Sequence, residues 1–217
     1  MNKTKISILL NVLIAIFVPV SWAMMYFAWT SSGALASPGL YSLRYFTVLS
    51  NILAGVVSLV YLLSVLKNKN NIAKVNSKFA TIKYVAATAV GLTFLVVVVF
   101  LGPTSPSGYL SMFVGANFFM HLITPLIAMI DMMFFYETAE IFSIKQSLLA
   151  VIPMIMYGIF YLGNLIVNGI GTYPNTNDWY GFAQWGMQYT YLIFVIVAFV
   201  TWLIALVIRA IHNKISK

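Results

Sequence analysis

The sequence predicts an all-α polytopic membrane protein, a bundle of six transmembrane helices with both termini in the cytoplasm. Of its 217 residues, 62% are hydrophobic and only 7% are charged, and the mean hydropathy is +0.95. Soluble domains are far less apolar than this. The apolar residues gather in six runs, each long enough to cross a bilayer as a helix. Lysine and arginine fall in alternate connections between these runs, which is typical of cytoplasmic loops.

Short connections join the six runs, so residues 1–217 are predicted to form a single transmembrane domain. The expected spans are about 6–29, 43–66, 82–101, 111–135, 146–168 and 185–209. The first run follows Lys3 and Lys5 and continues to Trp29. It is longer than the apolar core of a signal peptide, so we expect it to be retained as a helix. The third run is continuously apolar over residues 95–100, without the alternation of a barrel strand.

The basic residues determine the predicted orientation. Arg44 is the only basic residue on one side of the expected membrane. The other side holds Lys3, Lys5, Lys67, Lys69, Lys74, Lys78, Lys83, Lys145, Arg209, Lys214 and Lys217. Because cytoplasmic loops are enriched in lysine and arginine, this second side is predicted to be cytoplasmic.

Composition also excludes several kinds of site. The chain has no cysteine, two histidines and four carboxylates, so neither a thiolate site nor a metal centre is expected, and no cofactor is predicted. The net charge of +8 comes from residues between apolar runs. It therefore indicates membrane topology, and no nucleic-acid partner is expected.

Four of the expected helices carry a polar face. In the second, the face is formed by Arg44, Thr47, Asn51 and Ser58; in the fourth, by Asn117, His121, Thr124 and Asp131. The fifth helix carries Tyr157, Tyr161, Asn164 and Asn168, and the sixth opens with Gln184 and Gln188. Polar side chains in a membrane usually face the bundle interior, because their exposure to lipid is costly.

Depth along the helices separates these polar residues into two groups. With a rise of ~1.5 Å per residue, Thr47 is expected roughly 6 Å and His121 roughly 15 Å from the outer membrane surface. We therefore predict one outward-opening polar pocket, formed by Arg44, Thr47, Asn51, Asn117, His121, Thr124, Tyr161, Asn164 and Gln188. Asp131 lies toward the cytoplasmic end, where we expect it to cap a helix or pair near Lys145.

His121 is the only histidine well inside an expected span, and Pro125 follows it by one turn and frees a backbone carbonyl. A neutral imidazole there accepts a proton. The alternative is that His121 and Asn117 only form hydrogen bonds between helices. For Thr47, packing as a small residue is the corresponding alternative. Arg44 is either an interfacial anchor or a partner for an anionic group at the pocket mouth.

Three short motifs, in this order, resemble a known family: Tyr45-Phe46-Thr47, then Asn117-Phe118-Phe119-Met120-His121, then Tyr173-Pro174. An acidic residue, Asp131, also follows the histidine by ten positions. The chain resembles the androgen-induced gene and androgen-dependent TFPI-regulating protein family of transmembrane threonine hydrolases, and more closely its bacterial relatives, the Pr6Pr family. The resemblance covers most of the chain and implies a location in the bacterial cytoplasmic membrane.

The resemblance also implies an activity, the hydrolysis of fatty acyl esters, with Thr47 as the nucleophile and His121 as its base. A base must take the proton of a threonine hydroxyl before the oxygen attacks efficiently. Asn51 and Asn117 are expected to orient His121 or to donate to an oxyanion. Eukaryotic members carry additional histidines in the fifth helix, where this chain has Tyr161 and Asn164. The expected substrates are therefore fatty acid esters of hydroxy fatty acids or other lipid esters.

Two other readings fit the same residues. In the first, the protein binds or transports a lipid or small amphiphile without covalent chemistry, and Thr47, Asn51 and His121 contact the ligand. In the second, it is a structural subunit whose polar faces bind partner helices.

Overall fold

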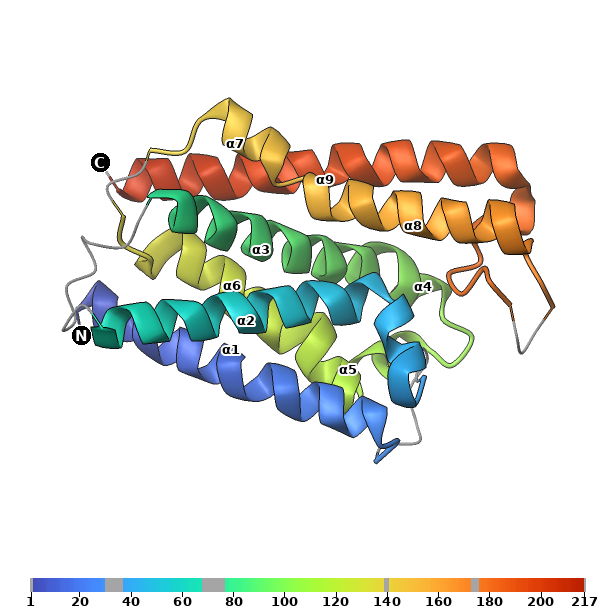
Figure 1. Cartoon of the computed structure of the whole chain (residues 1–217), viewed down its shortest axis with the longest axis horizontal. Coiled ribbons are helices and arrows are strands. Elements are labelled where there is room, and N and C mark those ends of the chain that lie inside the picture. Colours follow the sequence, from blue (N-terminus) through green and yellow to red (C-terminus); the bar gives the residue numbers. More distant parts are fainter. Residues whose placement is uncertain (1, 30–36, 68–76, 139–140, 173–175, 217) are drawn as a thin grey trace.

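The computed structural model of the chain describes residues 2–29, 37–67, 77–138, 141–172 and 176–216. Within these residues, six helices are long and apolar enough to cross a membrane, as the sequence predicts for a multi-pass membrane protein. They form an elongated bundle in which α1 begins and α9 ends at the same end (Figure 1). We call this the terminal end, and the opposite end the loop end.

The six spans are built from α-helices and from π-helical segments that continue them. The first two are α1 (Lys3–Tyr26) and α2 (Phe46–Lys67), and the third comprises α3 (Ser77–Val96), η3 (Val97–Leu101) and α4 (Gly102–Thr104). The fourth comprises α5 (Ala116–Phe118), η5 (Phe119–Ile123), α6 (Thr124–Ile130) and η6 (Asp131–Phe135). The last two are α7 (Ile144–Leu149) with α8 (Ile152–Asn168), and α9 (Met187–Ile215). Three short 3₁₀ helices lie at the loop end: η1 (Gly39–Arg44), η4 (Tyr109–Phe113) and η7 (Phe182–Trp185).

Two spans begin three or more residues later than the apolar pattern indicates. α2 starts at Phe46 because the preceding residues form η1, and α5 starts at Ala116 because η4 and a turn at Gly115 come before it. Gly115 has a φ of 59°, in a region of backbone conformation that glycine adopts readily. Thr47 therefore lies in the first turn of its helix.

The fourth span changes its hydrogen-bond pattern at Pro125. In the π-helical segment η5, the N–H of Thr124 donates to the carbonyl of Phe119, five residues earlier. The next residue is Pro125, which has no N–H, so the carbonyl of Met120 loses its helical donor. The Asn51 side chain of α2 donates to this carbonyl instead, at 3.0 Å. The proline thus creates a polar contact between α2 and the fourth span.

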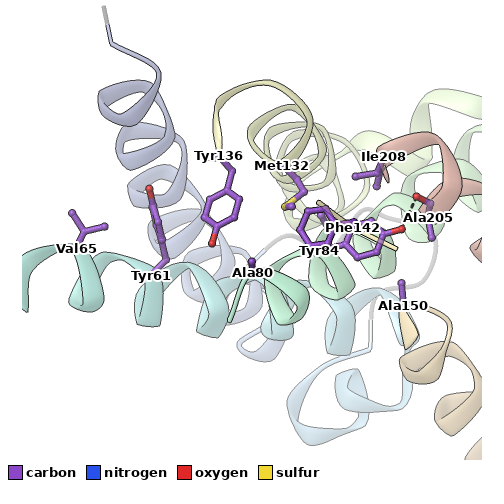
Figure 2. Packing of buried hydrophobic residues seen from close by; sticks show 11 residues of the cluster. Tyr61, Val65, Ala80, Tyr84, Met132, Tyr136, Phe142, Ala150, Ala205 and Ile208 are labelled. Atoms are coloured by element: carbon purple, nitrogen blue, oxygen red, sulfur yellow. Dashed lines mark hydrogen bonds between the residues drawn. The ribbon is translucent and has the colours of Figure 1, made fainter. Parts of the chain in front are cut away.

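α3 is the most buried of the six spans and contacts α2, α6 and α9. Figure 2 shows the packing on its terminal-end half, where Tyr84 stacks on Phe142 and its hydroxyl donates to the Ala205 carbonyl at 2.6 Å. α2 also packs closely against α1 at Gly55, because a Cβ atom at this position would lie 2.9 Å from the side chain of Val18 in α1. Aromatic packing and close helix contacts hold the bundle together.

The terminal-end half contains a buried ion pair that corrects two expectations. Lys83, counted above among the cytoplasmic loop residues, is 5% exposed on α3, and its ammonium lies 2.8 Å from the carboxylate of Asp131. Asp131 therefore pairs with Lys83 and not near Lys145. Lys83 lies six residues beyond the start of α3 and faces the bundle, where its ammonium also lies over the rings of Tyr61 and Tyr136. Asn11 of α1 bonds to both charged groups.

Some residues used in the sequence analysis fall outside the described part of the chain. They are Lys69, Lys74, Tyr173, Pro174 and Lys217.

Candidate functional site

Thr47 lies in the first turn of α2 at the loop end and is buried. Its side chain lines a small pocket of about 60 Å³, which we call the inner pocket. The walls come from α2, α3, η3, α8, η7 and α9 and include Thr93, Tyr157, Tyr180 and Phe182. Most of the surface is apolar, and Thr47 and Thr93 are among the few polar residues that line it.

His121 lies in η5 and is only 1% exposed. Its Nδ1 donates to the backbone carbonyl of Met112 in η4, at 2.7 Å. A carbonyl oxygen only accepts hydrogen bonds, so the Nδ1 atom must carry the proton. In the neutral imidazole, the Nε2 atom is then the one that accepts. His121 is therefore held in the tautomer that allows its Nε2 atom to act as a general base.

Asn51 connects the turn that holds Thr47 to the turn that holds His121. Its side-chain nitrogen donates to the Thr47 carbonyl at 2.7 Å and to the Met120 carbonyl at 3.0 Å. Asn51 itself lies one turn beyond Thr47 along α2, so the expected depth difference of roughly 9 Å between Thr47 and His121 stays a prediction.

The two hydrogens of the Asn51 amide are both directed at backbone carbonyls. Of the roles expected for Asn51, the geometry matches positioning of the two turns rather than donation to an oxyanion. Among the described residues, no hydrogen bond joins Thr47 to His121, and His121 does not line the inner pocket. Catalytic hydrogen bonds are often long in unliganded enzymes and shorten when substrate binds.

The remaining predicted residues of the fourth span lie near His121. Asn117, one turn before it, is 4% exposed, and Thr124, nearly one turn after it, is fully buried. Arg44 at the end of η1 is half-buried, with its guanidinium over the rings of Tyr45 and Trp179. It also donates to the hydroxyls of Ser37 and Tyr45, so it is held by the chain's own aromatic groups.

Three predicted pocket residues lie apart from Thr47. The Tyr161 hydroxyl donates to the carboxylate of Asp178, Asn164 donates to the carbonyl of Asn177, and Gln188 is exposed on α9. None of the three lines the inner pocket among the described residues. Tyr161 and Asn164 of α8 thus bond to the connection between α8 and α9.

The segment before α9 contributes groups that the sequence analysis did not assign to the site. Tyr180 accepts a hydrogen bond from the backbone N–H of Phe46 at 2.9 Å and so caps α2 beside Thr47. Trp179 donates to the Tyr157 hydroxyl, which itself donates to the Arg44 carbonyl. Burial raises the pKa of Tyr180 to about 12, so its phenol stays protonated at neutral pH.

Asp178 holds this segment in place. Its carboxylate accepts hydrogen bonds from the backbone N–H groups of Phe182 and Ala183, at 2.9 and 2.8 Å. An aspartate shortly before a helical turn is a recognisable capping signal. The chain has only four carboxylates, so the presence of Asp178 before this turn is the feature of the sequence that could have indicated an ordered segment here.

The electrostatic setting of Thr47 favours negative charge. It lies at the N-terminal end of a 22-residue helix, where the helix dipole stabilises anions. No group of three or more histidine, aspartate or glutamate side chains suited to a metal ion occurs in the described part of the chain.

Comparisons with protein-family models, curated proteins and solved structures gave no match to this chain.

Proposed function

We propose that this protein is an intramembrane hydrolase that cleaves fatty acyl esters of lipids, with Thr47 as nucleophile and His121 as general base. The bridge formed by Asn51 is the observation that carries the proposal, because it holds the turns of the two reacting side chains against each other. The resemblance to transmembrane threonine hydrolases supports the same assignment of Thr47 and His121.

The proposed reaction has two stages. First, the Thr47 oxygen bonds to the ester carbonyl carbon while its proton passes to Nε2 of His121. The carbonyl oxygen becomes an oxyanion near the N-terminus of α2, which stabilises it. The bond from carbon to the leaving alcohol then breaks, and the alcohol takes the proton from His121. Second, water attacks the acyl-threonine with the same proton route, releasing the fatty acid and restoring Thr47.

The groups around Thr47 and His121 prepare this chemistry in the proposal. The Met112 carbonyl fixes the His121 tautomer that leaves Nε2 as the acceptor. Tyr180 and the apolar walls of the inner pocket exclude bulk water from Thr47, which strengthens electrostatic interactions there. We further propose that the terminal end faces the cytoplasm of a bacterium and that the loop end, with Thr47, faces outward, as the distribution of basic residues indicates.

A second function is supported by a specific observation. Thr47 and His121 share no hydrogen bond among the described residues, and the inner pocket is mainly apolar. Both features suit a protein that binds or transports a lipid or small amphiphile without covalent chemistry. The two functions differ in whether Thr47 reacts.

The test is labelling of the purified protein with a fluorophosphonate probe, followed by peptide mapping. The hydrolase proposal predicts an adduct on Thr47 that is lost in Thr47→Ala and in His121→Ala. Thr93→Ala is the matched control, because Thr93 lines the same pocket and its loss leaves the proposed reacting groups intact. An unlabelled but folded wild-type protein would favour the binding function.

A further inference from the structure

A large apolar groove lies beside the inner pocket, on the outer surface of the bundle between α3 and α9. We call it the α3/α9 groove; its volume is about 820 Å³, and all thirteen lining residues are apolar or aromatic. Several of them are half-exposed or more, including Trp185, Tyr189, Leu192 and Ile196. The groove is therefore open at the face that membrane-spanning helices present to hydrocarbon.

The groove and the inner pocket share part of their walls. Leu92 and Val96 of α3, Phe182 of η7 and Val197 of α9 line both. These four residues form a shared wall between the lipid-facing groove and the inner pocket that Thr47 lines. The inner pocket of about 60 Å³ has room for a group of a few atoms, such as an ester. Of these two cavities, the groove is the one with room for a long hydrocarbon chain.

The length of the groove matches one half of a bilayer. Along α9 its lining runs from Tyr189 to Val200, which at ~1.5 Å per residue is about 16 Å. The hydrocarbon core is ~30 Å thick, so the groove is as long as the acyl chain of a single leaflet. Trp185 and Tyr189 stand at the loop-end rim, where aromatic residues mark the membrane interface.

We infer that the α3/α9 groove is the acyl-chain site of this protein, entered sideways from the leaflet at the loop end. This inference rests on the proposed function and adds the substrate class and the route: a lipid ester with a long acyl chain reaches Thr47 from within the bilayer. The chain lies along α9 with its far end toward Val200. The ester group passes between Val96 and Val197 into the inner pocket, and Phe182 covers it from the loop end.

The first test locates the chain without requiring any reaction at Thr47. Wild-type protein and Thr47→Ala are reconstituted with palmitic acid carrying a diazirine near its methyl end, irradiated, and mapped by mass spectrometry. The inference predicts several-fold more labelling of Ile196 in the groove than of Ile159 on α8, which is at least as exposed. Equal labelling of the two faces would overturn it.

The second test uses the shared wall between the groove and the inner pocket. Hexadecyl and ethyl fluorophosphonates are compared for their rate of reaction with Thr47. In the wild type, we expect the hexadecyl probe to react with Thr47 several-fold faster than the ethyl probe. Val197→Phe is expected to remove this preference, because the larger side chain blocks the passage between the groove and the inner pocket. Val195→Phe is the matched control, because Val195 lies on the same helix but is 67% exposed and does not line the groove.

The two proposals fail in different ways. Labelling of the groove by the diazirine acid without any fluorophosphonate adduct overturns the hydrolase and leaves the acyl-chain site standing. Reaction at Thr47 with no chain-length preference and no enrichment in the groove overturns the acyl-chain site and leaves the hydrolase standing. The diazirine experiment does not use Val197→Phe, so its result does not depend on how well that variant folds.

Discussion

Replacing Asn51 with alanine tests the bridge that brings the proposed reacting residues together. The change removes two hydrogen bonds donated by the side-chain nitrogen, at 2.7 and 3.0 Å. The Thr47 carbonyl keeps its ordinary helical partner, the backbone N–H of residue 51. The Met120 carbonyl has no such partner, because its next available donor position is Pro125.

The two losses therefore differ in size. The bond to Thr47 contributes about 0.5–1.5 kcal/mol, whereas a buried carbonyl left without a donor at Met120 costs about 1–3 kcal/mol. We expect Asn51→Ala to lower the free energy of unfolding by about 1.5–4.5 kcal/mol. We also expect it to slow fluorophosphonate labelling of Thr47, because the two turns are no longer tied.

The assay is equilibrium unfolding in mixed detergent micelles, with helicity followed by circular dichroism. Ser58→Ala is the matched control, since Ser58 is buried on the same face of α2 but makes no bond to the fourth span among the described residues. If Asn51→Ala and Ser58→Ala unfold within about 0.5 kcal/mol of each other, the bridge does not hold the site together.

Three further predictions concern groups around the bundle. We expect Lys83→Met and Asp131→Asn each to lower the free energy of unfolding by about 3–5 kcal/mol, because each leaves a buried charge unpaired. The double variant is expected to recover most of this loss, and additive losses in a double-mutant cycle would contradict the pairing. Asp178→Asn weakens the hydrogen bonds that Phe182, Ala183 and Tyr161 donate. We expect it to lower the free energy of unfolding by about 1–2 kcal/mol and to increase protease cleavage within residues 176–186. Unchanged cleavage would count against the capping role of Asp178. Burial raises the pKa of Tyr180 from 10.0 to about 12. The contribution of the protonated Tyr180 to the stability of the fold is therefore complete below pH 10 and is lost as the pH rises from about 10 to 12. The absorbance of the Tyr180 phenolate, taken as the difference between wild type and Tyr180→Phe, checks this, and a midpoint near pH 10 would refute it.

Length and apolarity were sufficient to predict the six spans. Each expected run corresponds to a helix long and apolar enough to cross a membrane, because a bilayer fixes both properties. The positions of helix starts were harder to predict. Residues 43–44 and 111–113 were included in the expected spans but belong to the 3₁₀ helices η1 and η4, since hydropathy does not distinguish a spanning helix from apolar structure at its end.

Spacing also found the polar faces that bring Thr47, Asn51 and His121 to adjoining turns, since helical periodicity determines which side chains share a face. It did not find the partner of Asp131. Lys83 lies at the edge of its apolar run, where lysine usually extends to the membrane surface, and only the packing of α1, α3 and η6 shows it buried.

The segment that covers Thr47 was the part least accessible from sequence. Tyr180 and Trp179 belong to a connection without helical periodicity, and interfacial aromatic residues are common in membrane proteins. Their roles depend on hydrogen bonds to Phe46 and Tyr157, more than 20 residues away along the chain. Asp178, as a cap of the following turn, was the local clue.

The most direct test of the central claim compares two variants of Thr47 in ester hydrolysis. Thr47→Ser keeps the hydroxyl, and Thr47→Val keeps the shape of threonine without it. We expect reconstituted wild type and Thr47→Ser to release nitrophenol from a long-chain nitrophenyl ester, and Thr47→Val to be slower by about 10³-fold or more, as when other nucleophiles are removed. Equal rates for Thr47→Val and wild type would contradict the claim that Thr47 is the nucleophile.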